Sequence, residues 1–128
     1  MEPVELLGSF REFGDGPGAV SLSEMVGVLD VKTSELAANY LTHGIRMSAV
    51  PGFRPDVLDG SEVSLSPAHM TDGIFVWLAD LPHYVRKYRI ALPERFLELL
   101  ASGATPPESL SEEQSERVNE WFQEHFGP

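Results

Sequence analysis

The tripeptide Thr71-Asp72-Gly73, followed at once by five apolar residues, constrains the fold more than any other feature of this chain. Asp-Gly readily adopts the positive φ angles that tight hairpin turns require. The run over residues 74–78, Ile-Phe-Val-Trp-Leu, is rich in β-branched and aromatic side chains, which is typical of a central, buried strand. Asp80 then stands where a helix N-cap is expected, with Pro82 in the first turn. A turn, a buried strand and a helix are therefore predicted in that order.

Apolar periodicity and capping residues predict further elements on both sides of this unit. Residues 45–50 alternate between apolar and polar, which is typical of a half-buried strand, and Val63 with Leu65 indicates a second short strand. Helices are expected over about 22–29, from Thr33 or Ser34 to Gly44, from Pro93 to Gly103, and from Ser109 or Ser111 onward. We therefore predict an α+β fold in which a small, mainly antiparallel sheet, from about residue 45 to 78, is flanked by N- and C-terminal helices.

The 128 residues have the length of a single domain, and a proline pair near the end divides the chain. We expect residues 1–103 to form one α+β domain, and residues 104–128 to form a proline-containing linker and an amphipathic helix docked on it. A free helix of about 16 residues is marginal in water, which favours docking on its own sheet. Its aromatic side could instead insert into another molecule.

The charge balance excludes some classes of partner. Twenty Asp and Glu residues against nine Lys and Arg residues give a net charge of −11. Nucleic acid and anionic lipid repel such a chain, and no apolar run approaches the roughly 20 residues of a membrane helix. The start of the chain is acidic where a signal peptide would be basic, so a cytoplasmic location is expected. The excess negative charge serves solubility alone, or it presents an acidic face to a basic protein.

Motifs for chemistry are scarce. There is no glycine-rich phosphate loop, serine nucleophile elbow or zinc-binding helix, and no cysteine. The four histidines stand at spacings that form no local metal pair, so we expect no metal and no cofactor. His69, three residues before Asp72, could serve acid–base chemistry with it, but a loop histidine beside a turn-forming aspartate is the favoured interpretation. The sequence therefore predicts a protein that is not an enzyme.

A pattern over somewhat under half the chain resembles a group of small, largely uncharacterised bacterial proteins that are common in actinobacteria. The shared pattern is Thr-Asp-Gly, aromatic, Trp, Asp-Leu, Tyr-Val, Leu-Pro and Phe, which here spans Thr71 to Phe96, with upstream parts at Tyr40-Leu41 and over residues 57–59. Some members look like immunity proteins, which bind and silence a cognate toxin without catalysis. The chain departs from the pattern at Phe75, where a second Trp is usual, and at Leu78, where Pro is usual.

Three hypotheses of function follow. The leading one is a non-enzymatic, acidic protein-binding module, most concretely an immunity-type inhibitor of a basic bacterial toxin. The alternatives are a self-associating scaffold that forms a homodimer through the last helix, and a small hydrolase that uses His69 with Asp72 or His83. Trp and Tyr are characteristic interface anchors, and acidic residues steer a basic partner. The residues predicted to bind a partner are Asp56, Asp59, Glu62, Asp72, Trp77 and Trp121.

Overall fold

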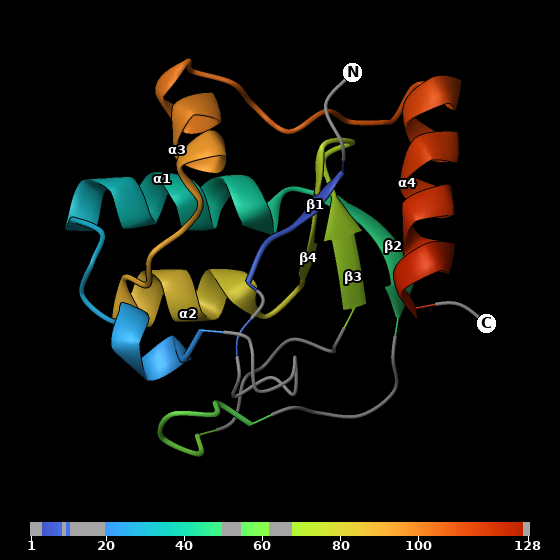
Figure 1. The fold of residues 1–128 in the computed structure, drawn as a ribbon. Coiled ribbons are helices and arrows are strands. Elements are labelled where there is room, and N and C mark those ends of the chain that lie inside the picture. Colours follow the sequence, from blue (N-terminus) through green and yellow to red (C-terminus); the bar gives the residue numbers. More distant parts are fainter. Residues whose placement is uncertain (1–3, 9, 11–19, 50–54, 62–67, 127–128) are drawn as a thin grey trace.

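The computed structural model describes residues 4–8, 10, 20–49, 55–61 and 68–126 (Figure 1). Its elements are β1 (Glu5–Leu6), the 3₁₀ helix η2 (Leu22–Met25), α1 (Val31–Thr42), β2 (Ile45–Ala49), β3 (Ala68–Thr71), β4 (Phe75–Leu78), α2 (Leu81–Tyr88), α3 (Glu94–Ala101) and α4 (Glu112–Phe126). The predicted α+β fold, with helices toward both ends of the chain, is confirmed.

The four strands form one mixed sheet in the order β1-β4-β3-β2. β2 pairs with β3, and β3 with β4, both antiparallel. β1, which lies outside the predicted 45–78 range, runs parallel to β4 with Glu5 beside Phe75. The sheet is therefore mixed rather than purely antiparallel. β3 was not predicted, and the strand expected at Val63 and Leu65 lies outside the described residues.

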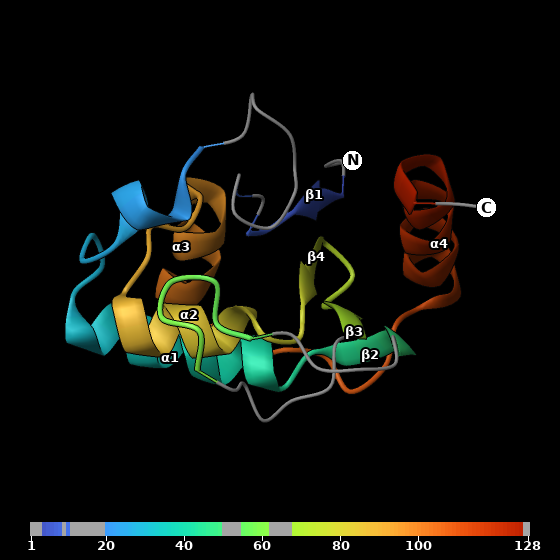
Figure 2. The ribbon, with the colours of Figure 1, turned by 90° about the horizontal axis from the view of Figure 1, so that it is seen from below.

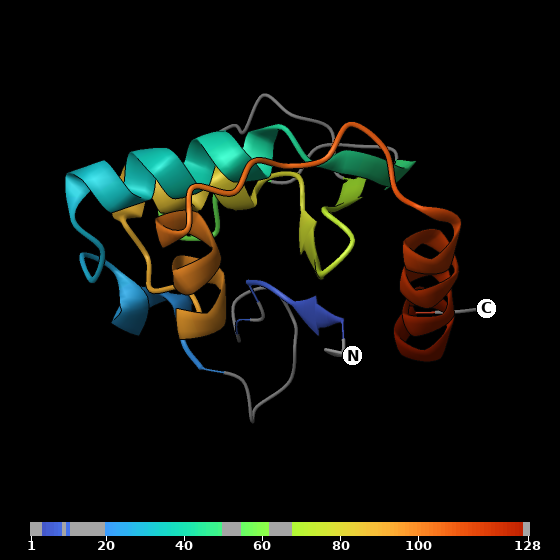
Figure 3. The ribbon, with the colours of Figure 1, turned by 90° about the horizontal axis from the view of Figure 1, so that it is seen from above.

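Helices cover both faces of the sheet. α1, α2 and α3 lie on one face and α4 lies on the other, as the views from below and above show (Figures 2 and 3). Phe75 and Trp77, two residues apart on β4, both enter the larger core with Phe96 of α3. Val76 points to the opposite face, where it packs with Val118 of α4. The apolar run of β4 thus supplies both layers of the core.

The caps differ in detail from those predicted. Asp30, not Thr33 or Ser34, caps α1, because its carboxylate accepts a hydrogen bond from the Thr33 amide at 2.6 Å. At α4 the reciprocal bonds run between Ser111 and Gln114, both at 3.1 Å, so the capping box begins at Ser111 and not at Ser109. Asp80 occupies the N-cap of α2 without a side-chain capping bond.

Gly44 follows α1, as predicted, but it is not the left-handed residue that commonly ends a helix. It does not adopt a positive φ angle. A Cβ atom at Gly44 would instead collide with the Trp77 ring. Trp77 is fully buried, and its indole N–H donates to the Leu41 carbonyl oxygen at 3.1 Å. The glycine therefore makes room for the tryptophan that joins the sheet to the end of α1.

Candidate functional site

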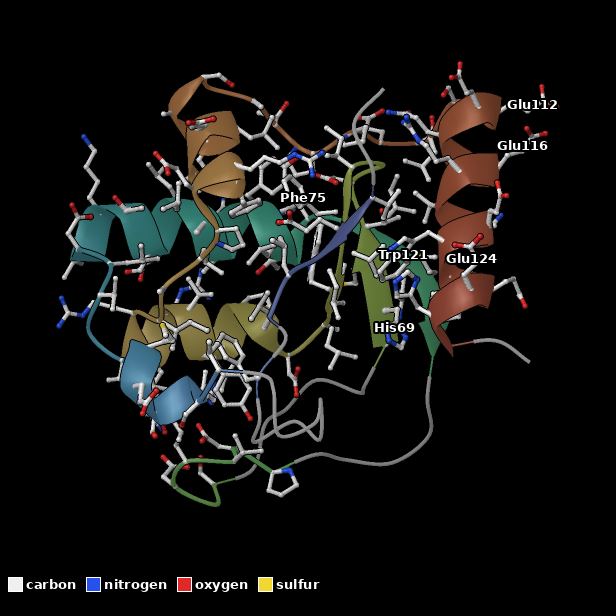
Figure 4. All side chains as sticks on the ribbon, in the orientation of Figure 1. His69, Phe75, Glu112, Glu116, Trp121 and Glu124 are labelled. Atoms are coloured by element: carbon white, nitrogen blue, oxygen red, sulfur yellow. The ribbon has the colours of Figure 1, made fainter. Side chains whose placement is uncertain are left out.

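The outer face of α4 carries more charged side chains than the surface of any other described helix. Figure 4 shows Glu112 and Glu116 pointing away from the sheet, while Trp121 points toward it. The five exposed glutamates of this acidic face are Glu112, Glu113, Glu116, Glu120 and Glu124. Within the described part of the chain, none of them forms an ion pair. The face therefore presents uncompensated negative charge to solvent.

Spacing makes this acidic face costly to the helix. Four of its glutamates recur every fourth residue, from Glu112 to Glu124, and residues four apart are neighbours on a helix surface. Each like-charge pair at this spacing destabilises a helix by about 0.2–0.5 kcal/mol. The stability of α4 therefore comes from its inner side, where Val118 is buried and Trp121 packs against the same small cluster of apolar residues.

Two predicted partner-binding residues, Asp56 and Asp59, lie together on a loop held against α2. Asp56 is 1% exposed and accepts hydrogen bonds from the Leu58 amide at 2.8 Å and the Tyr88 hydroxyl at 3.0 Å. It is also hydrogen-bonded to Nε2 of His83 at 2.7 Å. Asp59 is exposed and forms an ion pair with Lys87. Glu62, the third acid predicted here, lies outside the described residues.

The hydrogen bonds between this loop and α2 shift the pKa values of Asp56, Asp59 and Tyr88. Burial raises the pKa of Asp56, but the bonds from His83, the Leu58 amide and Tyr88 outweigh burial and hold that pKa below its ordinary value. The bond from Lys87 holds the pKa of Asp59 far below its usual range. Burial, and then the bond to Asp56, raise the pKa of Tyr88 to about 12. These contacts fasten the loop to α2, and Asp56 has no free acceptor facing a partner.

Asp72 and Trp77 are also inside the protein. Asp72 is 3% exposed and Trp77 is fully buried. The Asp72 carboxylate accepts from the amides of Ile74 and Phe75, at 2.9 and 2.7 Å, and from the Tyr40 hydroxyl at 2.5 Å. Neither side chain offers a surface to another molecule, so we do not retain them as partner-binding residues.

Trp121 and His69 lie where α4 meets the sheet. Trp121 is half-buried and stacks on His125, with ring centroids 4.2 Å apart. The His69 ring packs edge-on against Phe122 of α4, at 5.0 Å between centroids. One oxygen of Asp72 accepts a turn amide, and the other accepts the Tyr40 hydroxyl. A hydrogen bond from His69 to the Asp72 carboxylate would compete with these bonds. The His69–Asp72 pair is therefore not poised as an acid–base couple.

A groove between α3 and α4 was missed by sequence reasoning. Its volume is about 630 Å³, and its lining includes Phe75, Arg95, Leu99, Gln114 and Arg117. Arg95 and Arg117 stand 22 positions apart on separate helices, so no local pattern could have indicated that they share a groove. In a chain with only nine Lys and Arg residues, two arginines in one groove make it distinct from the acidic face.

Three further observations bear on function. Comparison with protein-family models, with curated proteins and with solved structures finds no match. Across the described ranges, no three His, Asp or Glu side chains are grouped so that they could hold a metal ion. None of the described helices has the length and apolar character needed to cross a membrane.

Proposed function

We propose that this chain is a non-enzymatic binding protein whose acidic face on α4 recognises a basic partner protein. The observation that carries the proposal is the row of exposed glutamates on α4, uncompensated by any basic partner in the described part of the chain. Complementary charge raises association rates by about 10 to 10³-fold, so a basic protein would gain most from such a face. The negative net charge of the whole chain acts in the same direction.

The packing of α4 favours this proposal over a scaffold that dimerises through the same helix. The apolar side of α4 already covers the sheet, with Val118 only 1% exposed. What remains outward is negative, and two such faces would repel each other. A dimer built on α4 would have to remove the helix from its own sheet.

The resemblance of the Thr71–Phe96 pattern to proteins that include immunity-like members supports a more specific form of the proposal. In that form the partner is a bacterial toxin with a basic active site, and the acidic face covers that site. Inhibition then requires only tight binding, with no bond made or broken.

The experiment is an affinity capture with matched charge variants. The full chain is immobilised and exposed to a lysate of its native host, alongside a variant in which Glu112, Glu116, Glu120 and Glu124 are all replaced by Gln. The control replaces four other exposed acids, Glu24, Glu35, Glu94 and Glu108, by Gln. Both variants change the net charge by the same amount, so only the position of the charge differs.

We expect a basic protein to be retained by the wild type and the control but lost from the α4 variant. If the two variants retained the partner protein equally, the position of the charge would not matter. The proposed acidic face would then be wrong. For the immunity form, adding the wild-type chain must abolish the toxic activity of the captured protein. A captured protein without toxicity would refute that form while leaving the binding function in place.

A further inference from the structure

We propose that the groove between α3 and α4 binds a small organic monocarboxylate with an apolar body. This inference does not rest on the proposed function, because the ligand of the groove is held by Arg117 and Gln114 and not by the glutamates of the acidic face. The groove volume of about 630 Å³ lies within the usual range for small-molecule sites, roughly 300–1,000 Å³. Its lining combines apolar side chains with a few polar groups, as such sites generally do.

Arg117 supplies the positive charge. It lines the groove from α4, where Glu113 stands four residues before it and Glu120 three residues after it, and it forms no ion pair with any described residue. Its Nε atom is shielded from solvent and has no hydrogen-bond partner among the described residues. A buried donor without an acceptor is destabilising, and more so in a charged group. A carboxylate oxygen in the groove would satisfy this donor, since guanidinium and carboxylate form two parallel bonds.

Gln114 adds a second donor from the same side of α4. Its side-chain oxygen accepts the Ser111 amide in the capping box, which orients the side-chain NH₂ group. That NH₂ group lies over the turn, where a Cβ atom at Gly73 would approach its nitrogen to 2.9 Å. Gln114 lines the groove three residues before Arg117, so the two donors share one helix face. An amide and a guanidinium together match the two oxygens of one carboxylate.

Neighbouring acids select a single negative charge. Arg95, the other arginine of the groove, has Nη1 at 3.7 Å from a Glu5 oxygen and lies over the Phe75 ring at 5.0 Å. Glu98 also lines the groove, from an exposed position on α3. These two carboxylates offset much of the positive charge, so a phosphate dianion would be disfavoured. A monoanion needs only Arg117, which forms no ion pair with any described residue.

The apolar body of the ligand would lie on the floor and the α3 wall. Ile74 and Leu99 line the groove and are half-buried, so each keeps surface for contact, and the buried Phe75 also lines the groove. Burying such apolar surface favours binding. The site therefore fits an aromatic or branched carboxylic acid better than a small inorganic ion.

The test uses 4-phenylbutyrate and its uncharged amide, 4-phenylbutyramide, with 3-phenylpropyl phosphate as the dianion. Each is titrated into the full chain while ¹⁵N NMR follows the signals of Gly73, Ile74, Gln114 and Arg117, including the Arg117 Nε–H. We expect saturable shifts at these positions with the acid, and binding weaker by roughly tenfold or more for the amide and for the phosphate. The NMR signal of the Arg117 Nε–H should move downfield when the acid is added, but not when the amide or the phosphate is added.

Variants separate the charge from the shape of the groove. Arg117→Gln should weaken acid binding by about tenfold while leaving the amide's affinity unchanged, and Arg117→Lys should lie between. Arg86→Gln removes the same charge from an exposed site on α2 and should bind the acid like the wild type. If the Arg117→Gln variant does not fold, the change in the NMR signal of the wild-type Arg117 Nε–H on adding the acid still tests whether Arg117 binds the carboxylate.

Several results would overturn the proposal. These are equal affinity for acid and amide, unchanged acid binding in Arg117→Gln, shifts confined to residues outside the groove, or no shift at about 10 mM acid. A peptide ending in phenylalanine that bound far more tightly than the small acid would overturn the assignment to a small molecule.

Discussion

The Tyr40 hydroxyl donates a hydrogen bond of 2.5 Å to the Asp72 carboxylate, joining α1 to the turn between β3 and β4. Both residues are buried, and the same carboxylate accepts the amides of Ile74 and Phe75. Burial, and then the bond to Asp72, raise the pKa of Tyr40 well above its ordinary value. The Asp72 side chain thus shapes the turn and ties it to Tyr40 of α1, which lies 32 residues earlier in the sequence.

Tyr40→Phe should lower the free energy of unfolding by about 1–3 kcal/mol, because it leaves a buried carboxylate oxygen without its donor. Urea denaturation of the variant measures this loss. Combining Tyr40→Phe with Asp72→Asn should give less than the sum of the two single losses, since the residues share one bond. Strict additivity, or a Tyr40→Phe loss below about 0.5 kcal/mol, would mean that the bond contributes little.

Gly44→Ala should destabilise the protein by about 1–3 kcal/mol, because the new methyl group would meet the Trp77 ring. The fluorescence of Trp77 should change as well, since the ring must move. Gly60→Ala is the control: it strains a backbone with φ of +76°, but no atom of the described residues lies within 4 Å of its new methyl group. If both variants alter the tryptophan spectrum equally, the close approach of Gly44 and Trp77 is not the cause.

Glu116→Lys should raise the free energy of unfolding by about 0.5–1.5 kcal/mol, since three glutamates stand three or four residues away on the same helix. The gain should shrink as salt is added, because the charges are exposed. Thermal denaturation at low and high ionic strength measures both effects. The same variant should weaken partner binding. A loss of stability would show that the acidic face carries no repulsive cost.

Asp56→Asn should be most destabilising at neutral pH, by roughly 1–3 kcal/mol. The folded protein holds the pKa of Asp56 below its ordinary value. The contribution of the Asp56 carboxylate to the free energy of unfolding is therefore complete above the pKa of an unfolded Asp, about 3.9. It is lost as the pH falls through the lower pKa of the folded protein. The difference between wild type and variant, measured by urea denaturation between about pH 2 and pH 7, should narrow on the acid side. A difference that widened below pH 4 would contradict this account.

Local patterns in the sequence correctly predicted the turn, strand and helix in which they occur. The Asp72-Gly73 turn, the apolar β4 and the start of α2 near Asp80 all lie where they were predicted. β1 and β3 were missed because neither carries a pattern of its own. β1 is two residues long and exists through its parallel pairing with β4, 70 positions later. β3 is the partner that the hairpin brings alongside β4.

The candidate site was harder to predict, because charge does not reveal burial. Asp56 and Asp72 were placed on a binding surface as charged residues, yet each is enclosed by donors from distant segments such as Tyr88 and Tyr40. The glutamates of α4 recur at the helix period in the sequence, but they were not among the residues predicted to bind a partner. The pairing of Arg117 with a groove on α3 depends on tertiary packing that no local pattern encodes.

The association rate of the captured partner, measured by stopped flow as ionic strength rises, tests the central claim most directly. If the acidic face of α4 steers the partner, the rate constant should fall steeply between about 50 and 500 mM salt, by roughly tenfold or more. The variant lacking Glu112, Glu116, Glu120 and Glu124 should start slower and change little. A wild-type rate that stayed constant with salt, or that matched the variant throughout, would contradict the account.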